Sequence, residues 1–424
     1  MSYYSPYFPF LVLPVVLAGL YFLLENRLTK PWMRWAWWIG CLLILLVAGW
    51  YASVQHQYWY DFIKGYYHSG RKIVANQDLL YDESCYGYVN FPLLAYLFVP
   101  FARLPKELAG ALFFLIGYLS ILPLAYSLVK FSGAKGWSRW VILGFLAVSG
   151  PLDYSVWLGN ITHVIMLGMI LLLWWFKQGR QWLTGFLLGA VGLIKIPLIL
   201  PAGYFFIRRQ WRVVGGGLLA FGIVLGLSLW LVPISLNTTW LDRCILSFSG
   251  NPVPAYNNQA VSGFLAREFM PGNLSWEPQS PPAGFALASN LALFMLYAPV
   301  LAILFLGFRS PRTPSMLLLE FFIVLVCSIL TSPISWTHYF MLLLIPAAFC
   351  MADDDLMGNK TWKYVLLGAA LLLISTPVKL TMALFEQTGQ ELFFSMYFIG
   401  GLLLYLFLIA VWIDFRRTAN RRSV

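Results

Sequence analysis

The chain has 424 residues, of which 60% are hydrophobic and 11% are charged, with 28 Lys and Arg against 17 Asp and Glu. An ordinary soluble domain carries about 25% charged residues, so this composition excludes a water-soluble fold and predicts that lipid is the solvent. The positive excess is a matter of membrane topology, as shown below, and does not call for a nucleic-acid partner.

Long apolar runs predict membrane-spanning helices, which need about 20 residues each. The first run, Phe8 to Leu24, has no basic residue before it and no small-residue cleavage site after it, so we expect a retained helix and not a secretory signal. Five later runs approach spanning length: Trp37 to Val54, Glu107 to Val129, Val213 to Ile234, Leu287 to Phe308 and Thr361 to Leu384. We therefore predict an all-α polytopic membrane protein with about 12–13 transmembrane helices, several of them short.

The positions of Lys and Arg predict the orientation of these helices, because cytoplasmic loops are enriched in both. Seven loops assigned to the inside hold 19 of the 28 basic residues: Arg27, Lys30, Arg34; Lys130, Lys135, Arg139; Lys177, Arg180; Arg208, Arg209, Arg212; Arg309, Arg312; Lys360, Lys363; and Arg416, Arg417, Arg421, Arg422. Four segments then lie outside: Gln55 to Lys106, Pro151 to Asn160, Ser235 to Gly284 and Pro333 to His338. On this map Phe91 to Phe101 lies along the outer interface, although it could instead cross the membrane.

The same map divides one integral membrane domain, residues 1–424, into four parts. Residues 1–34 form an N-terminal helix and a basic cytoplasmic loop, and residues 35–234 form a core that includes the first outer loop, 55–106. A second large outer loop spans 235–284, and C-terminal helices span 285–424.

Three apolar runs, Trp140 to Ser149, Trp182 to Ile194 and Pro197 to Ile207, are too short to cross the membrane alone. Short or broken helices survive at membrane depth only where protein or a wet cavity covers them. The sequence therefore predicts a cavity that opens on the outer side.

Asp61 is the most suggestive reactive residue, since it follows the helix ending at Val54 by a few residues and sits beside Tyr58, Trp59 and Tyr60. A carboxylate near headgroup depth needs a partner or a function. The structural alternative is that Asp61 caps an interfacial helix. Asp78, Asp82 and Glu83 lie further from the membrane and are better explained by solvation or turn capping.

Two cationic groups accompany it on the outer side. His338 lies at an outer helix mouth and either donates to a phosphate or is structural. Lys195, at the tip of a short helical hairpin, either snorkels to the interface or faces the cavity as an anion ligand. No Cys/His cluster or nucleotide-binding motif occurs, so we predict no metal site and no cofactor. Cys85 and Cys244 both map to the outer side, but the sequence favours no disulfide between them.

Several of these motifs together resemble glycosyltransferase family 87. They are Asp61 after the first long helix, the stretch from Leu79-Leu80-Tyr81 to Phe91-Pro92, Gly159-Asn160, the run from Gly185 to Gly192 that leads into Lys195 and Pro197, and Ser332-Pro333-Ile334-Ser335-Trp336 with His338. The resemblance extends from about Trp37 to Tyr339. Two features depart from it: the helix Phe8 to Leu24 is additional to the usual core, and Gly159-Asn160 stands where Gly-Gln is commoner.

The resemblance implies a GT-C fold and the transfer of a hexose, mannose by preference, from a polyprenyl-phosphate donor to a lipid or glycan acceptor. It makes Asp61 the catalytic residue and His338 a ligand of the donor phosphate. The chemistry agrees, because a sugar phosphate already carries a competent leaving group, so one carboxylate acting as general base suffices and the anomeric centre inverts. We expect further phosphate contacts from Lys195, Lys64 and Arg267. Substrate contacts are expected from Tyr60, Asn90, Asn160, Trp336 and Tyr339.

Two other interpretations remain open at this stage. A transporter or flippase for lipid-linked sugars would also use broken helices and intramembrane cations, although the sequence shows no internal repeat. A lipid-linked saccharide ligase or polymerase would also have many helices and a large outer loop. Under the favoured interpretation the protein is a metal-independent glycosyltransferase of a bacterial-type plasma membrane with its active site on the extracytoplasmic side.

Overall fold

The computed structural model describes residues 3–56, 58–82, 87–248, 250–306, 313–358 and 360–422. Throughout these ranges the regular structure is helical, and the extended pairing is limited to an isolated antiparallel bridge between Asn258 and Trp336. The all-α fold predicted from the sequence is thus confirmed. Glu83, Cys85, Arg309 and Arg312, which entered the sequence predictions, lie outside the described residues.

The helices are named in chain order, with η for π and 3-10 segments. The first half of the chain contains α1 (Phe8–Leu24), α2 (Pro31–Gln55), η1 (Phe62–Tyr67), α3 (His68–Ala75), η2 (Gln77–Leu79), η4 (Pro92–Phe98), α4 (Val99–Ala102), α5 (Lys106–Ser132), α6 (Gly136–Ala147), α7 (Gly150–Leu158), α8 (Thr162–Lys177), α9 (Gln181–Ile194), η5 (Ile196–Leu198), α10 (Ile199–Ile207) and α11 (Trp211–Leu231). The second half contains α12 (Ile234–Trp240), η6 (Leu241–Ile245), η7 (Leu246–Phe248), α13 (Val261–Phe269), α14 (Phe285–Leu306), α15 (Pro314–Thr331), η9 (Thr337–Leu343), α16 (Leu344–Ala352), α17 (Asp354–Met357), α18 (Thr361–Ile374), α19 (Val378–Thr388), η10 (Glu391–Ser395) and α20 (Met396–Arg422).

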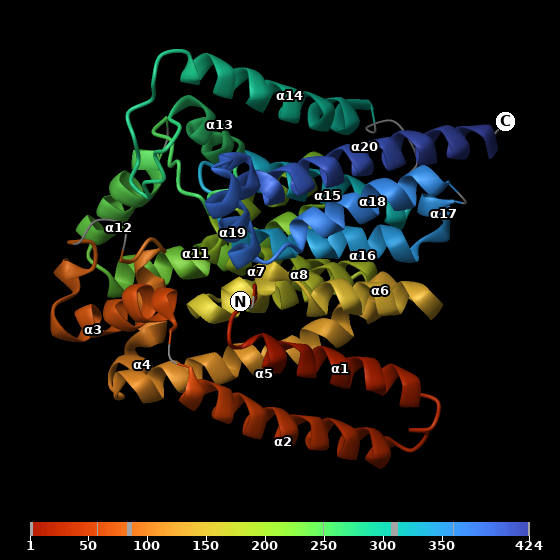
Figure 1. Ribbon diagram of the computed structural model, residues 1–424, viewed down its shortest axis with the longest axis horizontal. Coiled ribbons are helices and arrows are strands. Elements are labelled where there is room, and N and C mark those ends of the chain that lie inside the picture. Colours follow the sequence, from red (N-terminus) through yellow and green to blue (C-terminus); the bar gives the residue numbers. More distant parts are fainter. Residues whose placement is uncertain are drawn as a thin grey trace.

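The long helices run side by side and give the molecule two distinct ends (Figure 1). The α1–α2 connection, α17 and the C-terminus lie at one end, while α3, α4 and α12 lie at the other. The two large loops that the sequence assigns to the outside are therefore at the same end of the bundle. Both contain short helices, and Pro92–Ala102 is a helical segment too short to cross a membrane alone.

Among the residues that the structure describes, six helices are long and apolar enough to span a membrane, and the number rises to eight if each of two bent pairs counts as one span. Six shorter apolar helices of 10–17 residues accompany them in the described part of the chain, in agreement with the prediction that several of the helices are short. The prediction of one continuous helix from Thr361 to Leu384 was wrong, because α18 and α19 meet at an angle of 83°. Pro377 lies at this break, where it lacks an N–H for a continuing helix.

The centre of the bundle is α15, in which 83% of the apolar window is buried. The corresponding shares for α2, α11 and α14 are 28%, 22% and 22%, so these helices lie at the periphery and present apolar side chains outward. Such exposure is expected where lipid, and not water, is the neighbour.

The broken hairpin formed by α9 and α10 is fixed at both ends. Gly185 of α9 packs so closely on α11 that an added Cβ would lie 1.8 Å from the Val213 carbonyl oxygen, a close approach typical of membrane helix pairs. At the far end of α10, Arg208 forms a fully buried ion pair with Glu320 of α15, with 2.8 Å between nitrogen and oxygen. Arg208 is therefore a buried structural residue and not a solvated loop charge, and the hairpin holds its tip, Lys195, in a defined position.

Candidate functional site

Asp61 directly precedes η1 and follows the end of α2 by six residues. Its side chain caps no helix, which argues against the capping interpretation. Instead, the half-buried carboxylate accepts a hydrogen bond of 2.8 Å from the Asn160 amide nitrogen, a contact between residues 99 positions apart.

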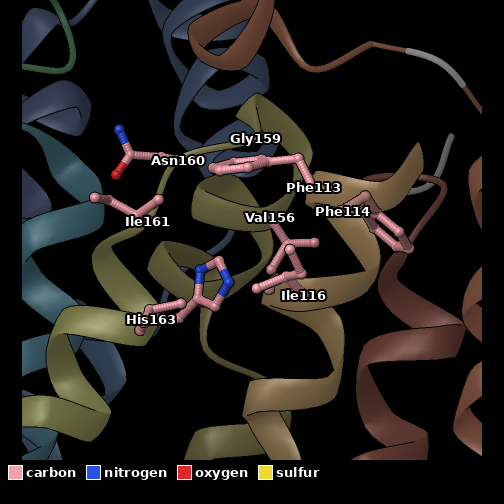
Figure 2. A pocket seen from close by; sticks show the side chains of 10 residues that line it. Phe113, Phe114, Ile116, Val156, Gly159, Asn160, Ile161 and His163 are labelled. Carbon is pink, nitrogen blue, oxygen red and sulfur yellow. The ribbon is translucent and has the colours of Figure 1, made fainter. Parts of the chain in front are cut away.

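Asn160 is held against Asp61 by the turn between α7 and α8. Gly159 adopts a left-handed conformation with φ of +68°, and a Cβ at this position would lie 2.8 Å from the Cβ of Phe62. Only glycine therefore fits between η1 and the α7–α8 turn without displacing one of them. Figure 2 shows the Asn160 amide directed away from Phe113 and His163, on the other side of the turn.

The orientation of the Asn160 amide is determined by its neighbours. Its oxygen accepts from the backbone N–H of Thr162 at 3.1 Å and from the Thr162 hydroxyl at 2.7 Å. Because both partners donate to the oxygen, the amide nitrogen is the atom left to face Asp61. The pair is thus a neutral donor placed against a carboxylate.

Lys195 completes this part of the site. The side chain is 7% exposed, and its ammonium lies 3.4 Å from the Asn160 amide oxygen and 4.5 Å from the centre of the Tyr339 ring. It therefore faces the interior of the site and does not snorkel to the interface. Burial raises the pKa of Asp61 above its usual value, while the Asn160 hydrogen bond and the Lys195 charge oppose that rise.

His338 lies next to this group, with its ring centre 5.0 Å from that of Tyr339 and 6.4 Å from that of Tyr154. It is 3% exposed, and neither ring nitrogen has a hydrogen-bond partner among the described residues. A buried imidazole without partners is costly, so it needs a ligand or a water to satisfy it. This makes His338 a ligand-binding candidate on stronger grounds than its sequence position alone.

A second layer of polar residues lies beneath the Asn160 turn. Ser155 accepts the Asn160 backbone N–H through its carbonyl at 2.8 Å, and its hydroxyl lies 3.0 Å from Nδ1 of His163. His163 also lines a mostly apolar pocket with Phe113, Phe114 and Val156 (Figure 2). His163 and Ser155 therefore support the turn that positions Asn160, and sequence reasoning missed both.

No described contact places the predicted phosphate ligands Lys64 and Arg267 beside Asp61, Lys195 or His338. Lys64 is exposed on η1. Arg267 is buried, and its guanidinium donates to the carbonyls of Ala255 and Asn258 at 2.8 and 2.9 Å and to the Ser395 hydroxyl at 3.0 Å. Its observed contacts thus brace the second outer loop.

The other predicted substrate contacts lie at different distances from Asp61. Tyr60 directly precedes Asp61 in the chain and is exposed. The Asn90 side chain lies against the Tyr66 hydroxyl, whose pKa is raised by burial and by the nearby Asp61 charge. Trp336 is half-buried and pairs through its backbone with Asn258.

Asp153, a second carboxylate of the outer side, is already occupied. It is 7% exposed and accepts hydrogen bonds from both the backbone N–H and the hydroxyl of Ser5, the former at 2.8 Å. With its oxygens engaged in this way, Asp153 is a poor candidate for a base.

The second outer loop contributes residues that the sequence analysis did not single out. Tyr256 places its hydroxyl 3.3 Å from that of Tyr154, and Asn257 donates to the Tyr154 hydroxyl at 3.4 Å. The available signal was the polar run Tyr256 to Gln259 within an otherwise apolar chain.

Within the described part of the chain, no group of three or more His, Cys, Asp or Glu side chains could hold a metal ion. Cys244 is disulfide-bonded, contrary to the expectation from sequence. Cys41, Cys327 and Cys350 are buried free thiols, as expected for small apolar residues of helices.

Comparison with known proteins gives a consistent result. The sequence profile described as glycosyltransferase family 87 matches residues 88–333, a range that contains Asn160 and Lys195 but neither Asp61 nor His338. Two relatives carry the name polyprenol-phosphate-mannose-dependent alpha-(1-2)-phosphatidylinositol pentamannoside mannosyltransferase. The one from Mycobacterium tuberculosis (strain CDC 1551 / Oshkosh) is 27% identical over 211 residues, which cover 48% of this chain and 43% of the relative. The one from Mycolicibacterium smegmatis (strain ATCC 700084 / mc(2)155) is 25% identical over 302 residues, which cover 69% and 68%. The first alignment thus spans less than half of that relative, and no solved structure matches the chain.

Proposed function

The chain belongs to glycosyltransferase family 87, and from this premise we propose that it transfers a hexose, most simply mannose, from a polyprenyl-phosphate donor to a lipid-linked glycan acceptor. The names of its relatives support both substrate classes. The observation that carries the proposal is the half-buried carboxylate of Asp61, oriented by Asn160 beside buried cationic and imidazole side chains.

Asp61 is the proposed general base. Its carboxylate takes the proton from the acceptor hydroxyl, whose oxygen forms a bond to the anomeric carbon of the donor sugar. The bond from that carbon to the phosphate oxygen breaks at the same centre, and polyprenyl phosphate leaves with the electron pair. Attack opposite the leaving group inverts the anomeric configuration, and the proton remains on Asp61 until the products depart.

Lys195 and His338 are the proposed ligands of the departing phosphate. The leaving group gains negative charge during transfer, and a buried ammonium stabilises such charge more strongly than it would in water. The imidazole of His338, which lacks a partner among the described residues, can donate one further hydrogen bond. Both side chains approach Tyr339, so one phosphate bound beside that ring would reach the two of them.

We further propose that the site faces the extracytoplasmic side. Most basic residues are assigned by the sequence to the opposite side, as cytoplasmic loops require. The disulfide at Cys244 in the second outer loop supports the same orientation, because disulfides persist in oxidising compartments. A lipid-linked donor also requires a site at the interface, where the prenyl chain stays in lipid while the sugar meets water.

The proposal is tested by Asp61→Asn in the purified full-length protein, supplied with synthetic polyprenyl-phosphate mannose and a mannoside acceptor. The amide keeps the size of the side chain but takes no proton, so we expect turnover to fall about 10²- to 10⁴-fold while donor binding persists. The matched control is Asp78→Asn, which removes an exposed carboxylate of the same outer loop. Near-normal turnover of the Asp61→Asn variant would assign the base elsewhere.

A further inference from the structure

Two exposed aromatic rings belong to the loops that the sequence assigns to the outer side, and each is supported by a less exposed ring. Tyr58, 46% exposed, stacks on Trp157 of α7 with 4.8 Å between ring centres and 23° between planes. Trp276, 44% exposed, lies 5.9 Å from Tyr256, and both belong to the second outer loop. We call Tyr58, Trp157, Tyr256 and Trp276 the aromatic platform.

The two halves of the platform are joined through Tyr154. Its ring centre lies 6.0 Å from that of Trp157, and its hydroxyl lies 3.3 Å from the hydroxyl of Tyr256. Three segments distant in the sequence are therefore packed together, and the buried Tyr154 and its neighbour Trp157 fix the relative positions of the two exposed rings.

Polar groups are interleaved with these rings. Asn257 donates through its amide nitrogen to the Tyr154 hydroxyl at 3.4 Å and accepts the indole N–H of Trp276 at 2.9 Å. The second contact holds the exposed Trp276 ring in one orientation. An arrangement of preoriented rings with a few hydroxyl and amide groups is typical of sites that bind neutral, amphipathic ligands.

The platform lies beside the proposed base. Tyr58 and Trp157 precede Asp61 and Asn160, respectively, by three residues, so the stacked rings and the hydrogen-bonded pair belong to the same contact between the segment after α2 and the α7–α8 turn. Burial raises the pKa of Tyr58 and of Tyr256, and the Asp61 charge adds to both shifts. No described contact joins Lys195 to a ring of the platform, whereas Lys195 does contact Tyr339. Lys379 places its ammonium 5.1 Å from the centre of the Trp157 ring, but that ammonium donates to the Tyr4 carbonyl at 3.2 Å. Asp61 thus has one set of neighbours suited to an anion and, in the exposed rings, another suited to a neutral ligand.

Resting on the proposed function, we propose that the aromatic platform is the acceptor subsite and that it binds the terminal neutral hexopyranose of the acceptor. A pyranose presents an apolar face of C–H groups, which stacks on an aromatic ring, and an edge of hydroxyls, which pairs with tyrosine and amide groups. A pyranose that stacks on Tyr58 would place one of its hydroxyls next to Asp61. The platform therefore recognises the terminal sugar of the acceptor and not a charged group.

Kinetic constants for donor and acceptor separate this role from the proposed role of Lys195 and His338. With octyl α-D-mannopyranoside as acceptor, Tyr58→Ala and Trp276→Ala should each raise the acceptor KM about 3- to 10-fold and leave the donor KM unchanged. Tyr58→Phe keeps the ring and should retain most of the affinity, which also guards against a variant that folds poorly. Trp276→Phe keeps a ring but loses the N–H that Asn257 accepts, so it should give an acceptor KM between those of the wild type and Trp276→Ala. Trp32→Ala is the matched control, because Trp32 is 65% exposed on α2 and belongs to no part of the platform.

Binding measured without turnover distinguishes failure of this inference from failure of the proposed function. Saturation-transfer NMR with methyl α-D-mannopyranoside should show binding to the Asp61→Asn protein and a loss of that binding on adding Tyr58→Ala. If the wild-type protein transfers no sugar yet binds the mannoside through Tyr58, the transferase proposal fails and the sugar site stands. The acceptor subsite would be overturned if Tyr58→Ala and Trp276→Ala left the acceptor KM unchanged or raised the donor and acceptor KM equally. Mannoside binding that is the same with and without these two substitutions would also overturn it.

Discussion

The hydrogen bond from Asn160 to Asp61 leads to a specific prediction about pH. This bond favours the ionised carboxylate, which is the form that the proposed base requires, and so does the nearby Lys195 charge. Asn160→Ala removes the bond and therefore raises the pKa of Asp61 further. Activity should be lost as the pH falls through this higher pKa and should recover as the pH rises above it.

The size of the effect follows from the nature of the bond. A hydrogen bond to a charged group contributes about 1.5–3 kcal/mol, and each 1.4 kcal/mol changes an equilibrium constant about tenfold. The ionised fraction on the acid side should therefore fall about 10- to 100-fold. Because Asp61 is only half-buried, solvent replaces part of the lost interaction, so we expect the lower part of this range.

The measurement is kcat/KM against pH for the purified protein in nanodiscs, with saturating donor in a series of overlapping buffers. Asn160→Gln is the matched control: it keeps the amide, which the commoner Gly-Gln sequence also supplies, and should shift the acid limb less. Thermal unfolding of each variant separates this effect from loss of the Thr162 contacts, which also depend on the Asn160 oxygen. A profile that is lower by one factor at every pH, with its acid limb unmoved, would refute the role of Asn160 in setting the ionisation of Asp61.

Four further predictions concern the site and its surroundings. His338→Ala should raise the donor KM and lower kcat together, whereas an effect on the acceptor KM alone would contradict phosphate binding. Transfer should be unaffected by EDTA, and activity abolished by EDTA and restored by Mg²⁺ or Mn²⁺ would contradict a metal-independent mechanism. Cysteines introduced singly at Asp78 and Asn273 should react with an impermeant thiol reagent from the same, extracytoplasmic side, and labelling of either only from the cytoplasm would reject the topology. Gly159→Ala should destabilise the fold by about 1–3 kcal/mol and lower kcat, because the new side chain sits on a left-handed backbone and against Phe62. A variant as stable and as active as the parent would contradict this role of Gly159.

Much of the fold was predictable because apolar length alone specifies a membrane helix. The bounds of α1 coincide with the predicted run Phe8 to Leu24, and α5 extends the run Glu107 to Val129 by only a few residues. The same reasoning failed at α18 and α19, where continuous apolarity concealed a bend of 83°. The signal was the sequence Ser375-Thr376-Pro377, since proline restricts its own backbone and that of the preceding residue.

The candidate site was only partly predictable, for a different physical reason. Asp61 could be selected because its depth follows from its distance along the chain from α2, which is a local property. Its pairing with Asn160 depends on the packing of η1 against the α7–α8 turn, and no local pattern encodes that contact. The same holds for Arg267, whose charge suggested a phosphate ligand but whose position inside the second outer loop commits it to backbone carbonyls.

Asp61 and Asp153, two of the carboxylates that the sequence assigns to the outer side, show how environment, more than residue type, distinguishes a proposed base from a structural acid. Asp153 accepts two hydrogen bonds from Ser5, so the segment before α1 satisfies it and keeps it from solvent. Asp61 accepts one described side-chain hydrogen bond, from a neutral amide, and remains half-exposed next to the platform and the buried Lys195. A base needs a lone pair that the acceptor can reach. Asp61 keeps such access, whereas Asp153 is 7% exposed and has a hydrogen bond from Ser5 on each oxygen. The N-terminal segment thus keeps Asp153 out of the proposed site, while Asp61 stays accessible to a substrate hydroxyl.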